Sequence, residues 1–108
     1  VPDNNRITRL AREYIADNLC SDIKIVDVCE YADTCRTKLY NAFADDCGVG
    51  IAEYIRRERL KLAYSLLKSG EFTVAEVSEK SGFSDYNYFS RIFKRRYGIS
   101  PYKIFKTE

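Results

Sequence analysis

The chain has 108 residues, a formal net charge of +2 at pH 7, and 45% hydrophobic and 31% charged residues, which predicts one soluble globular domain with a single modest core. It has no histidine, no glycine-rich phosphate loop and no run of about 18 apolar residues, so the usual zinc spacings, the common enzyme classes and a membrane span are not predicted. It begins at Val1 and contains no methionine, so we expect a piece of a longer polypeptide.

The first half of the chain predicts three helices. Asn4 and Asn5 can cap a first helix that ends near Asn18, and its apolar residues recur at helical spacing: Ile7, Leu10, Ala11, Tyr14 and Ile15. A short apolar helix follows, a break falls at residues 33–34, and a second short helix is closed by Gly48. Two short helices joined by a tight turn predict a helix-turn-helix over about residues 24–48.

A longer amphipathic helix is predicted over about residues 51–69, with Gly70 ending it. Its inward-facing residues are expected to be Ile51, Ile55, Leu62, Ala63, Leu66 and Leu67. At a rise of 1.5 Å per residue such a helix is about 28 Å long, so we interpret it as a linker between the two halves of the chain.

The second half predicts three more helices. Thr73 and Glu76 form a capping box for a helix that ends near Ser81. Ser84 can cap the next helix, residues 85–97, which Gly98 ends, and Ser100 with Pro101 begins a last short helix through residue 105. The two helices before Gly98 predict a second helix-turn-helix over about residues 73–98.

Residues 85–97 form the most informative of these helices. A stripe of Phe89, Ile92, Phe93 and Tyr97 is expected to be buried, which leaves an outward face of Tyr86, Asn87, Ser90, Arg91, Lys94 and Arg95. Asparagine and arginine can read base edges, while lysine, arginine and serine can reach phosphate oxygens, so this face suits a nucleic-acid groove. An ordinary solvated basic face on a small helical bundle fits the same residues.

The chain repeats itself. Residues 25, 28 and 29 match residues 74, 77 and 78 at an offset of 49, and residues 39, 43 and 48 match residues 89, 93 and 98 at an offset of 50. We match Cys35 with Ser84, so a one-residue insertion falls in the turn-to-helix segment of the second copy. The sequence therefore predicts a duplicated helix-turn-helix.

The four cysteines are Cys20, Cys29, Cys35 and Cys47, and no two of them form a CxxC pair. Each falls where a helix register favours a small or apolar side chain. We therefore expect inert thiols packed in the core and no bound metal.

Three segments of the chain resemble the AraC family of bacterial transcription regulators. They are GFSDYNYFSRIFKRRYGISP at residues 82–101, RLKLAYSLL at residues 59–67, similar to RLxxAxxLL, and VAEVS at residues 74–78, similar to VAEIA. The resemblance covers nearly the whole chain. It implies an all-α fold of seven helices, a homeodomain-like tandem double helix-turn-helix joined by a long central helix, forming one DNA-binding domain over residues 1–108.

The resemblance implies DNA contacts on the second helix of each predicted helix-turn-helix. With the outward face described above, the candidate DNA-binding residues are Arg36, Thr37, Lys38, Tyr40, Asn41, Ser84, Tyr86, Asn87, Tyr88, Ser90, Arg91, Lys94 and Arg95. The three tyrosines among them could instead be core or partner contacts. The first copy departs from the family where an arginine is usual at Asn41, in its acidic Asp45–Asp46 pair, and at the cap positions Lys24 and Cys35.

From these features we expect sequence-specific binding of double-stranded DNA in the bacterial cytoplasm, at the nucleoid, as the DNA-binding part of a transcription activator. The missing part is expected to be an N-terminal sensor, either a small-molecule pocket or a receiver as in response regulators. RNA polymerase is a further candidate partner, no cofactor or metal is implied, and the isolated domain is expected to bind one asymmetric, bent site as a monomer. The alternative is a helical protein-interaction module that docks on RNA polymerase or a partner regulator.

Charge is distributed unevenly, and this supports the DNA-binding interpretation. Residues 1–54 carry a formal charge of −4, whereas residues 55–108 carry +6. The positive half contains the helix of residues 85–97, so we expect the second unit to supply most of the affinity.

Overall fold

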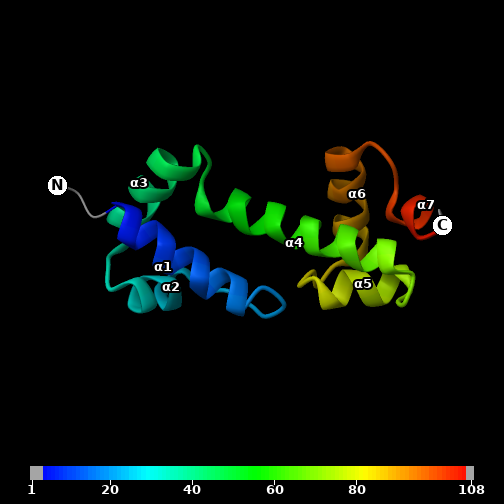
Figure 1. Cartoon of the computed structure of the whole chain (residues 1–108), viewed down its shortest axis with the longest axis horizontal. Coiled ribbons are helices and arrows are strands. Elements are labelled where there is room, and N and C mark those ends of the chain that lie inside the picture. Colours follow the sequence, from blue (N-terminus) through cyan, green and yellow to red (C-terminus); the bar gives the residue numbers. More distant parts are fainter. Residues whose placement is uncertain (1–3, 107–108) are drawn as a thin grey trace. The chain divides into compact units, whose positions relative to one another are not determined.

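The computed structural model describes residues 4–106, and within them it contains seven α-helices (Figure 1). Their bounds are α1 Asn4–Asp17, α2 Ile25–Ala32, α3 Arg36–Cys47, α4 Ile51–Ser69, α5 Val74–Lys80, α6 Tyr86–Tyr97 and α7 Pro101–Lys106. The predicted all-α, seven-helix fold is confirmed. None of the described helices is long and apolar enough to span a membrane. Asn4 and Asn5 are the first two residues of α1, and the predicted cap of this helix lies outside the side chains that the structure describes.

The chain divides into two compact units, and the division falls between Arg56 and Arg57, inside α4. Unit 1 contains α1, α2, α3 and the start of α4, and unit 2 contains the rest of α4 with α5, α6 and α7. Each unit has a hydrophobic core of its own. The chain is therefore two small helical units connected by one continuous helix.

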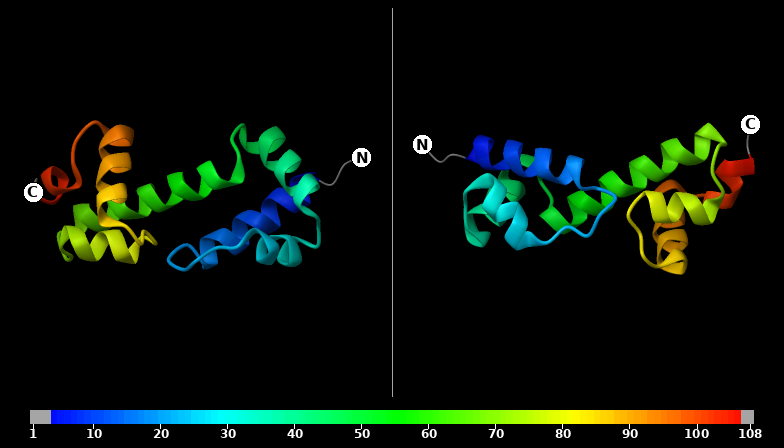
Figure 2. Two further views of the ribbon diagram at one scale, coloured as in Figure 1. Left: turned by 180° about the vertical axis from the view of Figure 1, so that it is seen from behind. Right: turned by 90° about the horizontal axis from the view of Figure 1, so that it is seen from below.

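In unit 1, α1 lies against both α2 and α3 (Figure 2). Its core is made of side chains that these three helices and α4 bury together: Ile7, Ala11, Ile15, Val28, Cys29, Leu39, Ala42, Phe43, Ile51 and Ile55. Fully burying a large side chain of this kind contributes about 1.5–3 kcal/mol. Burial on α1 thus holds both helices of the helix-turn-helix in place.

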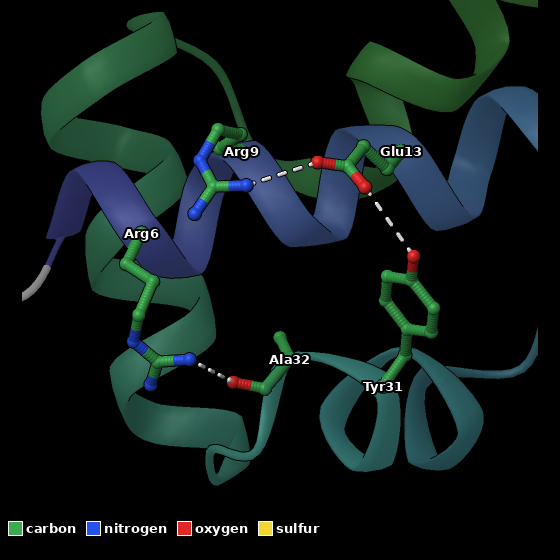
Figure 3. A network of polar contacts seen from close by, with 5 residues as sticks. All are labelled: Arg6, Arg9, Glu13, Tyr31 and Ala32. Atoms are coloured by element: carbon green, nitrogen blue, oxygen red, sulfur yellow. Dashed lines mark hydrogen bonds and ion pairs between the residues drawn. The ribbon is translucent and has the colours of Figure 1, made fainter.

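Polar contacts on the surface of unit 1 connect α1 to α2 (Figure 3). The Glu13 carboxylate accepts hydrogen bonds from the Arg9 guanidinium at 3.1 Å and from the Tyr31 hydroxyl at 3.3 Å. Arg6 donates to the Ala32 carbonyl oxygen at 3.3 Å, at the last residue of α2. The Glu13 carboxylate also raises the pKa of Tyr31, because ionising the phenol beside it would place two negative charges together. These contacts orient the end of α2 just before the turn.

In unit 2, α5, α6 and α7 contact one another (Figure 1). The core consists of Leu60, Ala63 and Leu67 of α4 with Val74, Val77, Phe89, Ile92, Phe93 and Ile104. Aromatic rings extend it along α6, since the Tyr97 ring lies 4.7 Å from Phe93 and 4.9 Å from Tyr64. Such ring pairs add about 0.5–1.5 kcal/mol each beyond their buried area. The predicted buried stripe of α6 is confirmed at Phe89, Ile92 and Phe93, while Tyr97 is half-buried.

The buried face of α4 differs from the prediction. Leu60 is buried although it was not expected to be, and Leu62 and Leu66 are only half-buried. The prediction assumed a single apolar stripe along the helix. That assumption fails because the two ends of α4 belong to different cores.

The repeat predicted from the sequence is present in the turns. In unit 1 the Thr34 N–H donates to the Cys29 carbonyl oxygen at 2.9 Å, and in unit 2 the Phe83 N–H donates to the Ser78 carbonyl oxygen at 3.0 Å. These two bonds are equivalent at an offset of 49 residues. The two turns therefore reverse the chain in the same way.

The start of the following helix is equivalent at an offset of 50 instead. The Leu39 N–H donates to the Cys35 carbonyl oxygen at 2.9 Å, and the Phe89 N–H donates to the Asp85 carbonyl oxygen at 3.0 Å. Cys35 is thus equivalent to Asp85, and the match of Cys35 with Ser84 is wrong. The inserted residue in the second copy is Ser84.

One residue of the first turn has an unusual backbone conformation. Asp33 adopts the left-handed conformation with a φ of 53°, at the position where unit 2 has Gly82 with a φ of 94°. This conformation is unfavourable for most residues with a side chain, and aspartate tolerates it better than most. The first turn is therefore more strained than the second.

Candidate nucleic-acid interface

Both ends of α6 are well defined by capping. The Asp85 carboxylate accepts a hydrogen bond from the Tyr88 N–H at 3.1 Å, which satisfies one of the unpaired donors at the helix start. At the other end the Gly98 N–H donates to the Lys94 carbonyl oxygen at 2.7 Å, with Gly98 at a φ of 81°. Asp85 and not Ser84 is the cap, because its carboxylate stands one residue before the first helical residue.

The outward face of α6 carries the predicted contact residues. Asn87, Arg91 and Lys94 follow one another at i, i+4 and i+7, so they form a row on the side opposite Phe89 and Phe93. All three are exposed, as are Tyr86 and Arg95 on the same helix and Ser84 in the turn before it. The structure therefore brings together an amide, two guanidinium groups and an ammonium group on one solvent-facing surface.

Two predicted residues of α6 are only partly exposed. Ser90 is half-buried, and so is Tyr88, which packs on the core of unit 2. The Tyr88 ring lies 6.4 Å from the Phe83 ring, and the Arg91 guanidinium carbon lies 5.6 Å from the centre of the Tyr88 ring. Phe83 was not among the predicted residues. The only sequence signal for it was the GF pair at residues 82–83, which precedes α6.

The five predicted residues of unit 1 lie on α3, and all of them are exposed: Arg36, Thr37, Lys38, Tyr40 and Asn41. The helix begins after Cys35, whose side chain accepts no capping hydrogen bond from the residues that the structure describes. The same holds within the described chain for Lys24, the cap residue of α2. Both cap positions at which the first copy departs from the family thus lack a side-chain cap among the described residues.

The two outward faces differ in charge at equivalent positions, related by the offset of 50. In place of Asn87, Arg91 and Lys94 of α6, helix α3 has Thr37, Asn41 and Ala44. In place of Arg95 and Arg96 it has Asp45 and Asp46, both exposed. The Asp46 carboxylate accepts a hydrogen bond from the buried Thr8 hydroxyl at 2.6 Å, so it also connects α3 to α1.

The cysteines do not all lie in the core. Cys29 is buried and Cys47 is half-buried, but Cys20 and Cys35 are exposed, which corrects the expectation that all four are packed inside. Burial raises the pKa of the Cys29 thiol above its ordinary value. Among residues 4–106 no group of three or more metal-ligating side chains comes together.

A hollow on the surface of unit 1 has none of the predicted contact residues in its lining. It is lined by α1, by Asp45 and Asp46 at the end of α3, and by Tyr54 of α4. Ion pairs and hydrogen bonds occupy much of its lining, as between Arg9 and Glu13 and between Arg12 and the Tyr54 hydroxyl. The hollow is therefore not assigned to the predicted DNA-contact surface of α3.

The arrangement fits one class of protein. In each unit a second helix, held from behind by a buried face and a tight turn, presents polar side chains to solvent where a DNA groove can receive them. Amide and guanidinium groups at i and i+4 can reach adjacent base edges, and neighbouring cations can reach phosphates. This is the geometry of a DNA-binding domain with two helix-turn-helix units.

Comparisons with known proteins agree. A family model described as a helix-turn-helix domain matches residues 28–107. The chain is 33% identical over 101 residues to the arabinose operon regulatory protein of Escherichia coli (strain K12), covering 93% of this chain and 34% of that protein. It is 29% identical over 101 residues to the transcriptional activator RhaR of Yersinia pseudotuberculosis, covering 94% and 34%.

A solved structure is also similar. The C-terminal domain of AraT, a response regulator from Geobacillus stearothermophilus, superposes with a TM-score of 0.85 at 28% identity, over 94% of this chain and 85% of that one. The chain belongs to the AraC-type family of helix-turn-helix regulators, and the resemblance seen in its sequence is confirmed. It spans about a third of the length of the curated relatives it matches.

Proposed function

We propose that this chain is the DNA-binding part of a bacterial transcription activator and that it reads double-stranded DNA with α3 and α6 in the major groove. An activator role is supported by the similarity to RhaR, which is described as a transcriptional activator. The role proposed here is recognition and requires no catalytic group. It would be carried out where the bacterial chromosome lies, in the cytoplasm.

The roles of the α6 residues follow from their chemistry. Asn87 suits the N6 and N7 edge of adenine, and Arg91 suits the O6 and N7 edge of guanine, each good bidentate pair discriminating by about 1–3 kcal/mol. Lys94 and Arg95 lie farther along the helix and suit phosphate oxygens, which position the protein without reading sequence. We therefore propose Asn87 and Arg91 as base readers and Lys94 and Arg95 as backbone contacts. Ser84, Tyr86 and Ser90 are proposed as neighbouring contacts.

Unit 1 is proposed as the weaker reader. Arg36, Lys38 and the polar residues beside them on α3 can enter a groove, but Asp45 and Asp46 follow where α6 has two arginines. Carboxylates near phosphates lower affinity, because phosphate contacts supply a large share of the binding free energy. We propose that the helix-turn-helix units, about residues 24–48 and 73–98 with the linker helix at about 51–69, together bind one asymmetric site as a monomer.

The observation that carries this proposal is the exposed row of Asn87, Arg91 and Lys94 on a helix capped at both ends. The test is to select bound sequences from a random duplex library with this chain, then to measure affinity for the selected duplex at several salt concentrations. We expect one non-palindromic motif and an affinity that falls steeply with salt.

Two variants separate reading from anchoring. Asn87→Ala should relax the preference at one position of the motif, whereas Lys94→Ala should weaken all duplexes alike and lower the salt slope by about 1. A motif that is unchanged by Asn87→Ala would show that this side chain is not a base reader. Failure of the unaltered chain to select any motif would refute the proposed function itself.

The exposed acidic end of α3 supports the proposal of a second binding surface, for a protein partner. Asp45 and Asp46 lie where a phosphate contact would be expected, so this end suits a basic protein surface better than DNA. RNA polymerase is the partner we propose for it, in a full-length protein that also contains an N-terminal sensor. Loss of activated transcription in Asp45→Ala with DNA affinity intact would support that assignment.

A further inference from the structure

We infer that Tyr88 is a positioning residue for Arg91: its ring, held from behind by Phe83, supports the Arg91 guanidinium in the orientation that reads a base. The inference rests on the proposed function and deepens it. It assigns to Tyr88 an indirect role in specificity in place of a direct contact with DNA.

Tyr88 is held firmly from two sides. Its backbone N–H is bound by the Asp85 carboxylate at 3.1 Å, so the first turn of α6 is anchored at this residue. Its ring lies 6.4 Å from the Phe83 ring, and the Phe83 ring in turn lies 5.0 Å from the ring of the fully buried Phe89. A continuous row of aromatic rings therefore leads from the core of unit 2 to its surface.

Arg91 lies at the surface end of this row. Its guanidinium carbon is 5.6 Å from the centre of the Tyr88 ring, within the distance at which a cation is attracted to an aromatic face. The two residues are three apart on the helix, the spacing at which side chains meet. A planar guanidinium that is already oriented loses less conformational freedom when it forms two parallel hydrogen bonds to a guanine edge.

Unit 1 shows that the fold does not require this arrangement. The residues equivalent to Phe83, Tyr88 and Arg91 are Thr34, Lys38 and Asn41, and unit 1 forms its turn and its recognition helix without an aromatic ring there. Lys38 is exposed, and the Thr34 hydroxyl is buried with no hydrogen-bond partner among the described residues. The aromatic row is thus a feature of the α6 surface and is not common to the two units.

The test uses the whole chain and the duplex selected with it. Arg91→Ala first identifies the base pair whose preference depends on Arg91. Discrimination at that pair, the ratio of affinities for the selected and the substituted duplex, is then measured for Tyr88→Phe, which keeps the ring, and Tyr88→Leu, which removes it. We expect Tyr88→Phe to match the unaltered chain and Tyr88→Leu to lose discrimination by about two- to fivefold.

Two further measurements distinguish positioning from simple packing. In an Arg91→Ala background, Tyr88→Leu should cause no additional loss of discrimination at that pair, because the residue it positions is gone. Tyr88→Lys introduces the residue that unit 1 has at the equivalent position, so it serves as a second variant if the leucine variant folds poorly. A contact of the added charge with phosphates is independent of sequence and cancels in the ratio.

The outcomes are separable. Unchanged discrimination in both Tyr88→Leu and Tyr88→Lys, or an equal loss with and without Arg91, overturns the positioning role. A loss in Tyr88→Phe as large as in Tyr88→Leu shows instead that the hydroxyl contacts DNA directly, which also overturns it. If the unaltered chain selects no motif, the proposed function fails, and this inference fails with it.

Discussion

Replacing Cys35 by serine should stabilise the first helix-turn-helix. Cys35 occupies the cap position of α3 in an extended conformation, with φ −111° and ψ 169°. Thr73, which caps α5 in a similar conformation with φ −70° and ψ 164°, accepts a hydrogen bond from the Glu76 N–H at 3.2 Å. A serine hydroxyl at residue 35 can likewise accept a hydrogen bond from the Lys38 N–H. The exchange replaces the sulfur atom by a smaller oxygen atom and changes nothing else.

The magnitude follows from measured caps. A serine, threonine or aspartate cap contributes about 0.5–2 kcal/mol, typically about 1 kcal/mol. For a domain of this size, about 1 kcal/mol raises Tm by about 4–8 °C. Urea unfolding at 25 °C and thermal unfolding, both followed by circular dichroism at the helix signal, would measure the change.

Matched variants make the result decisive. Cys20→Ser exchanges the same atom at an exposed thiol outside the helices, so it should leave stability unchanged. Asp85→Ala removes the equivalent cap of α6 and should cost about 1 kcal/mol. If Asp85→Ala shows that cost while Cys35→Ser changes nothing, the reasoning that the first unit lacks a cap is refuted.

Three other predictions concern the two units. We compare two triple variants, one in each unit: Asn87→Ala, Arg91→Ala and Lys94→Ala in unit 2, and Arg36→Ala, Lys38→Ala and Asn41→Ala in unit 1. The loss of DNA affinity at fixed salt should be larger for the unit 2 variant. An equal or larger loss in the unit 1 variant would contradict the asymmetry. Asp33→Gly should raise the free energy of unfolding by about 1 kcal/mol, because glycine adopts a φ of 53° without strain, while Asp33→Asn, which only removes the charge, should change it little. In native protein at pH 8, Cys20 and Cys35 should react with a thiol reagent about tenfold faster than Cys29, whose burial and raised pKa disfavour the reactive thiolate; equal rates, resolved by peptide mass spectrometry, would show that α2 opens readily.

Most of the helices could be predicted because their signals are local. Thr73 with Glu76 bounds α5 within one turn of chain, and Gly48 and Gly98 end their helices through a backbone conformation that glycine adopts easily. The apolar spacing of residues 89, 92 and 93 indicates the buried face of α6 and, by exclusion, its outward face. The repeat and the uneven charge are likewise properties of the sequence.

What the sequence did not predict depends on which elements pack together. Leu60 is buried in place of Leu62 because the second half of α4 packs in another core than the first half, and a local period cannot show where one core ends. Cys35 fits an apolar register but is exposed, because it stands at the cap before α3 begins. Burial is decided by neighbours that are distant in sequence.

The functional surface shows the same division. The sequence by itself determined that Asn87, Arg91 and Lys94 share the outward face of one helix, since helical spacing alone places them there. Only the tertiary structure decided that Tyr88 turns partly inward against Phe83 and that Arg91 lies over its ring. The physical reason is that the direction of a side chain at the edge of a buried stripe depends on what packs beside it, here a ring from the preceding turn.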